Sequence, residues 1–137
     1  MSTPEVVSLA AKIATEAHQG QFRRDGVTPY VRHPEAVAAR VAGDYLAEAV
    51  AWLHDVLEDT AITVDDLKRS GVPDEVITRV VLLTNKGGIA YEHYLEHIKA
   101  DAVATKVKIA DMLTNLGDTP TESQVAKYAK GLLTLLS

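Results

Sequence analysis

The sequence predicts an all-α fold, a compact single domain over residues 1–137. Three observations support this prediction. Apolar residues recur with helical rather than strand spacing along nearly every segment, which divides the chain into about eight helices. Hydrophobic residues make up 47% and charged residues 24% of the chain, as in globular proteins. A length of 137 residues matches one domain that can build a core.

The first half of the chain is divided by helix-capping residues, prolines and glycines. Proline early in a first turn and an acidic residue beside it favour a helix start, and Gly43 is a plausible stop. The expected elements are a helix from Ser2-Thr3-Pro4-Glu5 to about Ala17, a loop from Gly20 to Pro34, a helix from Pro34 to about Ala42 and a helix from the Asp44 cap through Leu57.

The second half of the chain is divided by residues of the same kinds. Thr121 with Gln124 resembles a capping box, and Asn85-Lys86-Gly87-Gly88 reads as a loop. The expected helices run from the Thr63 cap to before Gly71, from Pro73 to about Leu83, from about Ala90 to Ala100, from about Ala102 to Leu116 and from Thr121 to Leu136.

Composition excludes several classes of function. Cysteine is absent, which rules out disulfides and thiolate metal sites and makes the cytoplasm the expected location. We expect no membrane partner, because no apolar run approaches the ~18 residues that span a bilayer and the N-terminus lacks a signal-peptide pattern. The net charge of -5 argues against nucleic-acid binding. A small phosphorylated substrate needs only a local basic pocket and stays compatible. The sequence leaves the oligomeric state open.

Acidic and histidine side chains gather near the end of one apolar helical segment. His54 and Asp55 are neighbours, and Glu58 and Asp59 follow one turn later, so that each i, i+4 pair shares a face. Burying an unpaired carboxylate costs several kcal/mol, so such a group needs a partner. A divalent metal satisfies all of these side chains at once.

Two further segments offer ligands for the same ion. Asp111 lies in a mostly apolar helix, with Asn115 one turn later, and His33 precedes a proline at a loop-to-helix junction. The candidate metal ligands are therefore His33, His54, Asp55 and Asp111. Two nitrogens and two oxygens suit Mn²⁺, Fe²⁺ or Zn²⁺ better than Ca²⁺.

Such a site predicts hydrolysis of a phosphate ester or anhydride. Coordination positions that the protein leaves open would take water and a phosphoryl oxygen, and the ion would acidify that water. Glu58 and Asp59 would orient or deprotonate the water and protonate the leaving oxygen.

These residues resemble the HD superfamily of metal-dependent phosphohydrolases, and more narrowly the hydrolase domain of RelA/SpoT-type alarmone enzymes. The resemblance spans about Ala17 to Leu116. It rests on three ordered motifs: Ala17-His18-Gln19-Gly20-Gln21-Phe22-Arg23-Arg24-Asp25-Gly26 with Pro29-Tyr30 and His33-Pro34; Leu53-His54-Asp55-Val56-Leu57-Glu58-Asp59-Thr60; and Val107-Lys108-Ile109-Ala110-Asp111-Met112-Leu113-Thr114-Asn115-Leu116.

The resemblance implies a role for each matching residue. His33, His54, Asp55 and Asp111 would hold one Mn²⁺, and Glu58 and Asp59 would be the catalytic acidic pair. Arg23 would stack on or bracket a guanine base, and Asn115 would contact the nucleotide. Apart from the resemblance, the loop position of Arg24 favours a side chain that faces a substrate phosphate or solvent. The implied activity is that of a small alarmone hydrolase, which removes the 3′-pyrophosphate of ppGpp or pppGpp to give GDP or GTP.

Alternatives remain at this point. The same metal site would serve an HD-type enzyme for another nucleotide, NADPH or a phosphate ester, and a non-catalytic nucleotide-binding module is a further alternative. The spacing of Asp111 and Lys108 also suits an ion pair between them. For Asn115 the structural alternative is a hydrogen bond that braces two helices. His93 and His97 have the i, i+4 spacing of zinc helices, but no further ligand motif accompanies them, which favours an exposed helix face.

Overall fold

The computed structural model describes residues 3–137, which form nine α-helices and no strand within that range. The predicted all-α class is therefore confirmed; Ser2, part of the expected first cap, lies outside the described residues. The helices are α1 (Thr3–Ala17), α2 (Arg32–Arg40), α3 (Tyr45–Leu53), α4 (Val56–Asp59), α5 (Val64–Arg69), α6 (Asp74–Leu83), α7 (Tyr91–Lys99), α8 (Ala102–Leu116) and α9 (Glu122–Leu136).

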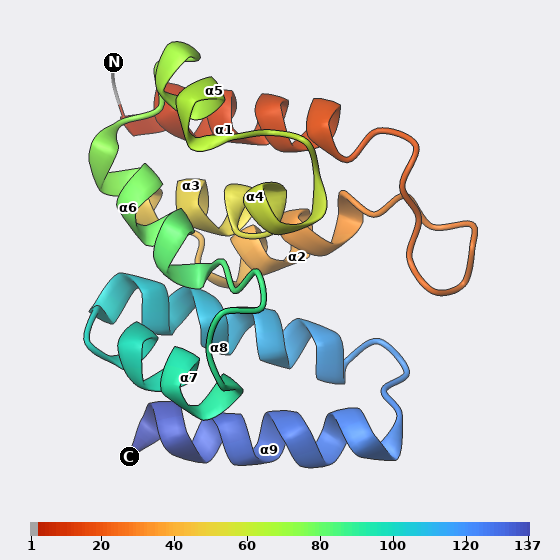
Figure 1. The fold of residues 1–137 in the computed structure, drawn as a ribbon. Coiled ribbons are helices and arrows are strands. Elements are labelled where there is room, and N and C mark those ends of the chain that lie inside the picture. Colours follow the sequence, from red (N-terminus) through yellow and green to blue (C-terminus); the bar gives the residue numbers. More distant parts are fainter. Residues whose placement is uncertain (1–2) are drawn as a thin grey trace.

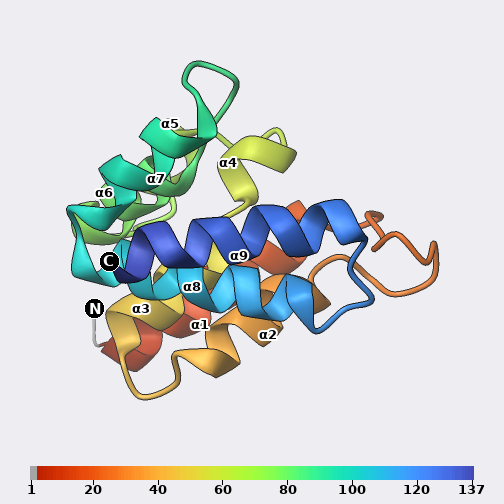
Figure 2. The ribbon, with the colours of Figure 1, turned by 90° about the horizontal axis from the view of Figure 1, so that it is seen from below.

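The helices stack in layers, with α1 at the top of Figure 1, α2 and α3 beneath it, then α8, and α9 at the bottom. Figure 2 shows α9 crossing over α8 on the lower side. The central helix α3 buries Ala47, Ala49, Val50, Ala51 and Leu53, which lie all round its axis. Alanine at three of these positions leaves room for the neighbouring helices α1, α2 and α8 to approach closely.

The expected single helix through Leu57 is wrong, because the chain breaks between α3 and α4 at His54 and Asp55. Its predicted start is correct: Asp44 caps α3 and its Oδ1 accepts the Ala47 N–H at 3.1 Å. In an uninterrupted helix the Ala51 carbonyl would accept the Asp55 N–H. Here it accepts the His54 Nδ1–H at 2.6 Å and the His54 N–H at 3.4 Å. The helix therefore ends, and the count rises from the predicted number to nine.

The other boundaries follow the expected caps with small shifts. Capping boxes form at Thr63 with Asp66 and at Thr121 with Gln124, as the latter pattern predicts. α2 begins at Arg32 rather than at Pro34. Proline is tolerated there because the first turn of a helix has no intrahelical acceptor for its N–H.

Gly131 allows α9 to lie close to its neighbours. A Cβ at this position would come within 2.8 Å of the Met112 Cε atom and 3.4 Å of Leu95. We expect Gly131→Val to lower the free energy of unfolding by about 1–3 kcal/mol through overpacking, despite the better helix propensity of a non-glycine residue. Chemical denaturation of both proteins measures this, and an unchanged or raised stability would contradict the close packing.

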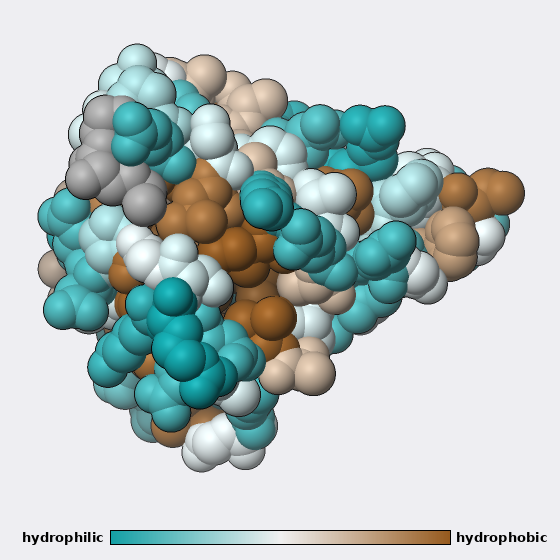
Figure 3. Space-filling model, turned by 90° about the horizontal axis from the view of Figure 1, so that it is seen from above, coloured by the Kyte–Doolittle hydropathy of each residue, from teal (hydrophilic) through white to brown (hydrophobic). Residues whose placement is uncertain are grey.

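The surface has a projecting loop, which contributes residues to the site described below, and an apolar patch. The loop between α1 and α2 projects at the right of Figure 1, beside the loop between α8 and α9. Seen from above, hydrophobic side chains gather in the middle of the face that carries α1 and α5, and hydrophobic atoms also mark the projecting end (Figure 3). Val27, in the projecting loop, is 74% exposed. Across residues 3–137, every helix is too short or too polar to cross a membrane.

Candidate active site

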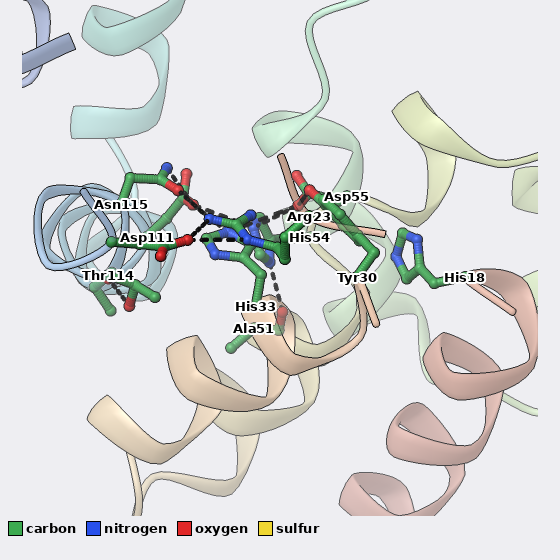
Figure 4. A network of polar contacts seen from close by, with 12 residues as sticks. His18, Arg23, Tyr30, His33, Ala51, His54, Asp55, Asp111, Thr114 and Asn115 are labelled. Atoms are coloured by element: carbon green, nitrogen blue, oxygen red, sulfur yellow. Dashed lines mark hydrogen bonds and ion pairs between the residues drawn. The ribbon is translucent and has the colours of Figure 1, made fainter. Parts of the chain in front are cut away.

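Three segments distant in sequence bring their His and Asp side chains to one point (Figure 4). α2 supplies His33, the break after α3 supplies His54, and α8 supplies Asp111. One potential ligand atom from each lies within 4.8 Å of the others, and all three residues are buried. The Asp111 Oδ1 atom lies 2.8 Å from His33 Nε2 and 3.4 Å from His54 Nε2.

Asp55 lies beside this group. Its Oδ2 atom is 3.1 Å from His54 Nε2 and 3.9 Å from His33 Nε2. The helix break places Asp55 here, since it turns two adjacent side chains toward the same centre. The structure thus brings all four predicted ligands together, with Asp55 outside the tightest group of three.

The donor set fits a divalent metal. His54 Nδ1 donates to the Ala51 carbonyl, and this bond directs Nε2 toward the two carboxylates. Nε2 is buried and makes no hydrogen bond to any residue in 3–137, although carboxylate oxygens lie 3.1 and 3.4 Å away. A buried nitrogen that faces carboxylates without bonding to them has the arrangement of a metal ligand. The group of His33, His54 and Asp111 can therefore hold a divalent ion.

The charges in this centre are mutually dependent. Burial by itself would lower the pKa of His54, but the carboxylates of Asp55 and Asp111 outweigh burial and raise it well above its ordinary value. Burial would raise the pKa of Asp111, yet Lys108 and His54 hold it well below the ordinary value. The carboxylates therefore stay ionised and require positive charge beside them, which an imidazolium or a metal ion provides.

Lys108, which the sequence analysis considered as an ion-pair partner of Asp111, is a component of the site. Its Nζ atom lies 2.9 Å from Asp111 Oδ2, and its side chain is only 14% exposed. It also lies 5.4 Å from the centroid of the Tyr94 ring, within the range of a cation–π contact. Asp111 thus uses one oxygen for Lys108 and turns the other toward the histidines, so its ion pair with Lys108 is compatible with a role as a metal ligand.

Tyr30 supports Asp55 from the projecting loop. Its hydroxyl donates to Asp55 Oδ2 at 2.6 Å, to the same oxygen that faces the histidines. The sequence analysis placed this residue in a motif without assigning it a role. The hydrogen bond explains why tyrosine, and not another aromatic residue, suits this position.

We expect Tyr30→Phe to weaken metal affinity by about 10-fold, at the low end of what loss of a hydrogen bond to a ligand costs. The ring and its packing beside His18 and His33 would remain. Titration of the metal-free variant with Mn²⁺ measures the change. An affinity equal to that of the unaltered chain would show that the hydroxyl does not orient Asp55.

The cluster opens into a cleft of about 460 Å³. Glu58 and Asp59, the predicted proton-transfer pair, both line this cleft next to Asp55. Glu58 Oε1 accepts the Asn85 N–H at 2.7 Å, which fixes its side chain against the loop that precedes α7. Burial raises the pKa of Asp59, and the negative charges of Asp55 and Glu58 raise it further. Asp59 therefore takes up a proton more readily than an ordinary aspartate does.

The predicted substrate contacts line the same cleft. Arg23 donates from Nη2 and Nε to Asp118 Oδ2 at 2.7 and 3.2 Å, which ties the projecting loop to the loop after α8. Arg24 lines the cleft too, but its Nη2 lies near the carbonyls of Asp118 and Thr119 rather than facing solvent alone. Sequence reasoning missed Asp118, for which no pattern in the chain gave a signal.

Asn115 connects Asp111 with Arg23 and Tyr128. Its Nδ2 atom lies 3.3 Å from Asp111 Oδ1 and 3.4 Å from the Tyr128 hydroxyl, and its Oδ1 accepts from Arg23 at 3.5 Å. It therefore braces α8 against α9, as the structural alternative predicted, while still lining the cleft. His93 and His97 lie on an exposed face of α7, as expected.

Comparisons with known proteins agree with this arrangement. No family model matches the chain. A guanosine-3′,5′-bis(diphosphate) 3′-pyrophosphohydrolase of Haemophilus influenzae is 51% identical over 41% of this chain and 9% of its own length. The protein of that name from Aquifex aeolicus is 36% identical over 82% of this chain and 17% of its own. The chain is an HD-type domain of the RelA/SpoT kind.

A third relative of this RelA/SpoT-type domain is a probable GTP pyrophosphokinase of Mycobacterium leprae, 32% identical over 93% of this chain and 18% of its own length. The chain therefore spans less than a fifth of these curated relatives. A solved structure of a metazoan ortholog of SpoT, described as hydrolyzing ppGpp, superposes with a TM-score of 0.76 at 24% identity, over 95% of this chain and 83% of its own. That likeness confirms the predicted HD-type fold.

Proposed function

We propose that this domain removes the 3′-pyrophosphate of ppGpp and pppGpp by metal-dependent hydrolysis, giving GDP or GTP plus pyrophosphate. The observation that carries the proposal is the buried group of His33, His54 and Asp111 at the base of a cleft lined by two more carboxylates, Glu58 and Asp59. The names of the Haemophilus and Aquifex relatives support the choice of substrate.

In the proposed enzyme, His33, His54, Asp55 and Asp111 hold one ion, with Mn²⁺ as the expected metal and Fe²⁺ or Zn²⁺ as alternatives. When bound, the ion supplies Lewis acidity toward a phosphoryl oxygen and lowers the pKa of a coordinated water. The protein contributes the orientation of the ligands, through the Ala51 carbonyl, which accepts from His54, and the Tyr30 hydroxyl, which donates to Asp55.

Glu58 and Asp59 divide the proton transfers in this proposal. Glu58, held by the Asn85 N–H, accepts a proton from the attacking water. Asp59, whose pKa burial and neighbouring charge raise, holds a proton and donates it to the leaving ribose oxygen. Both side chains line the cleft beside the metal-binding group, which is where the two proton transfers require them.

Arg23, Arg24 and Asn115 bind the guanosine part of the substrate in this proposal. The bonds from Arg23 to Asp118 fix the guanidinium plane at the cleft wall, with Cζ 5.7 Å from the centroid of the Tyr30 ring. A plane held in this way is a platform on which a base can stack. Asn115 presents its amide to the same space.

A second candidate keeps the metal and changes the substrate to another nucleotide, NADPH or a simpler phosphate ester. The observation that favours it is the engagement of Arg23 and Arg24 with Asp118 and Thr119, which reduces their hydrogen-bonding capacity for a guanine base. Stacking without hydrogen-bond readout tolerates any base.

Hydrolysis assays on the Mn²⁺-loaded chain separate the two candidates. The substrates are ppGpp, dGTP, NADPH and a generic phosphate ester, with and without a chelator. We expect chelator-sensitive pyrophosphate release from ppGpp and little turnover of the others, and a marked loss of selectivity in Arg23→Ala. Turnover of the other substrates with ppGpp left intact would favour the second candidate.

A further inference from the structure

We propose that Lys127 on α9 binds the 5′-linked phosphate group of the substrate and makes the cleft prefer nucleotides that carry phosphate at both ribose positions. This inference rests on the proposed function, because it assigns the second anionic group of the same substrate to a second wall of the same cleft.

The charge balance of the cleft singles out Lys127. Four cationic side chains line it, and three already have oxygen partners: Arg23 with Asp118, Arg24 with backbone carbonyls and Lys108 with Asp111. Among residues 3–137, Lys127 has no carboxylate within ion-pair distance, and its exposed side chain contacts aromatic rings. An anion can therefore pair with Lys127 without first breaking an ion pair.

Two tyrosines hold the Lys127 ammonium at the cleft wall. Its Nζ atom lies 4.4 Å from the centroid of the Tyr91 ring on α7 and 5.8 Å from that of Tyr128 on α9. Both distances are within the range of cation–π attraction, which reduces the freedom of a long side chain. Tyr91 also lines the cleft, and its buried hydroxyl has no hydrogen-bond partner in the described part of the chain.

A short series of contacts separates Lys127 from the metal-binding group. Asp111 contacts Asn115, Asn115 contacts the Tyr128 hydroxyl, and the Tyr128 ring lies beside Lys127. Lys127 makes no ion pair with the metal-binding residues within 3–137, and its ammonium contacts the tyrosine rings instead. In this inference it binds the phosphate group that is not hydrolysed, which a ribose substituted at the 3′ and 5′ positions provides.

The same helix offers a matched control. Lys130 follows Lys127 by three residues on α9, but its Nζ pairs with Glu92 of α7 at 3.1 Å, and it does not line the cleft. Both members of that pair are strongly exposed, so removing the charge of Lys130 costs little stability. Lys130→Ala thus removes an equal charge from the same helix without touching the anion site.

Steady-state hydrolysis of two substrates tests the assignment: ppGpp, and guanosine 3′-diphosphate, which lacks the 5′ group. We expect Lys127→Ala to raise KM for ppGpp about 10-fold with little change in kcat, as loss of one charge-assisted contact does. KM for guanosine 3′-diphosphate should stay unchanged. Lys127→Arg should restore most of the ppGpp affinity, and Lys130→Ala should behave like the unaltered chain. Equal effects on both substrates, or none, would overturn the assignment.

Equilibrium binding separates failure of this inference from failure of the proposed function. GDP and guanosine are titrated into the full chain in the presence of a chelator. A GDP affinity about 10-fold lower in Lys127→Ala, with guanosine unaffected, supports the phosphate contact even if no substrate is turned over. Equal GDP affinity in both proteins overturns it, whereas absent turnover of ppGpp by the unaltered chain overturns the proposed function alone.

Discussion

We expect His54→Ala to lose its bound metal and to hydrolyse ppGpp more than about 100-fold more slowly than the unaltered chain, because loss of even an indirect partner of a ligand costs 10- to 100-fold. His54 Nε2 faces both carboxylates of the centre, and no other imidazole can replace it at the helix break. Metal content per chain and the initial rate of pyrophosphate release are the two measurements.

The control for this variant is His93→Ala, which removes an imidazole from an exposed face of α7. It should keep full metal content and rate. Circular dichroism of both proteins checks that the helices persist, because His54→Ala also removes the hydrogen bond from His54 to the Ala51 carbonyl. A His54→Ala protein with undiminished metal and rate would refute the ligand set.

The second large effect is expected from Glu58→Gln, which should keep the metal and lower turnover by about 10²- to 10⁴-fold, the range that general acid–base catalysis contributes. Glutamine retains a carbonyl oxygen that can accept the Asn85 N–H, so the loop before α7 stays in place. The substitution removes the basic carboxylate and little else.

Comparison with Glu58→Ala separates chemistry from positioning. Alanine loses both the carboxylate and the contact with Asn85. Similar rates in the two variants would attribute the loss to the carboxylate, whereas a much slower Ala variant would show that the contact matters as well. If Glu58→Gln released the metal, Glu58 would be a ligand and the proposed division of roles would be wrong.

The helices were predictable because their signals are local. Helical spacing, the Asp44 cap and the Thr121 capping box each act within a few residues, and each appears in the structure. The break at His54 was not predictable from spacing, since the apolar pattern of α3 continues into Val56 and Leu57. It depends on a side chain that takes the Ala51 carbonyl, and only the fold shows this.

The residues of the site also fall into those that the sequence indicates and those that only the fold reveals. His33, His54, Asp55 and Asp111 were identified because ligand types recur in ordered motifs, and the structure brings all four together. The spacing of Lys108 indicated its ion pair with Asp111 but not its place in the cleft, and the roles of Tyr30 and Lys127 were not predicted, because a tyrosine or a lone lysine has no spacing signal of its own. Their positions are set by packing between helices and loops that are distant in sequence.

The identity of the products released from ppGpp tests the central claim most directly. The Mn²⁺-loaded chain and its His54→Ala variant are incubated with ppGpp, and the nucleotides and phosphates are separated and quantified. Our account predicts GDP and pyrophosphate in equal amounts from the unaltered chain, lost on chelation and in the variant. Intact ppGpp after incubation with the metal-loaded chain, or equal release by the variant, would contradict it.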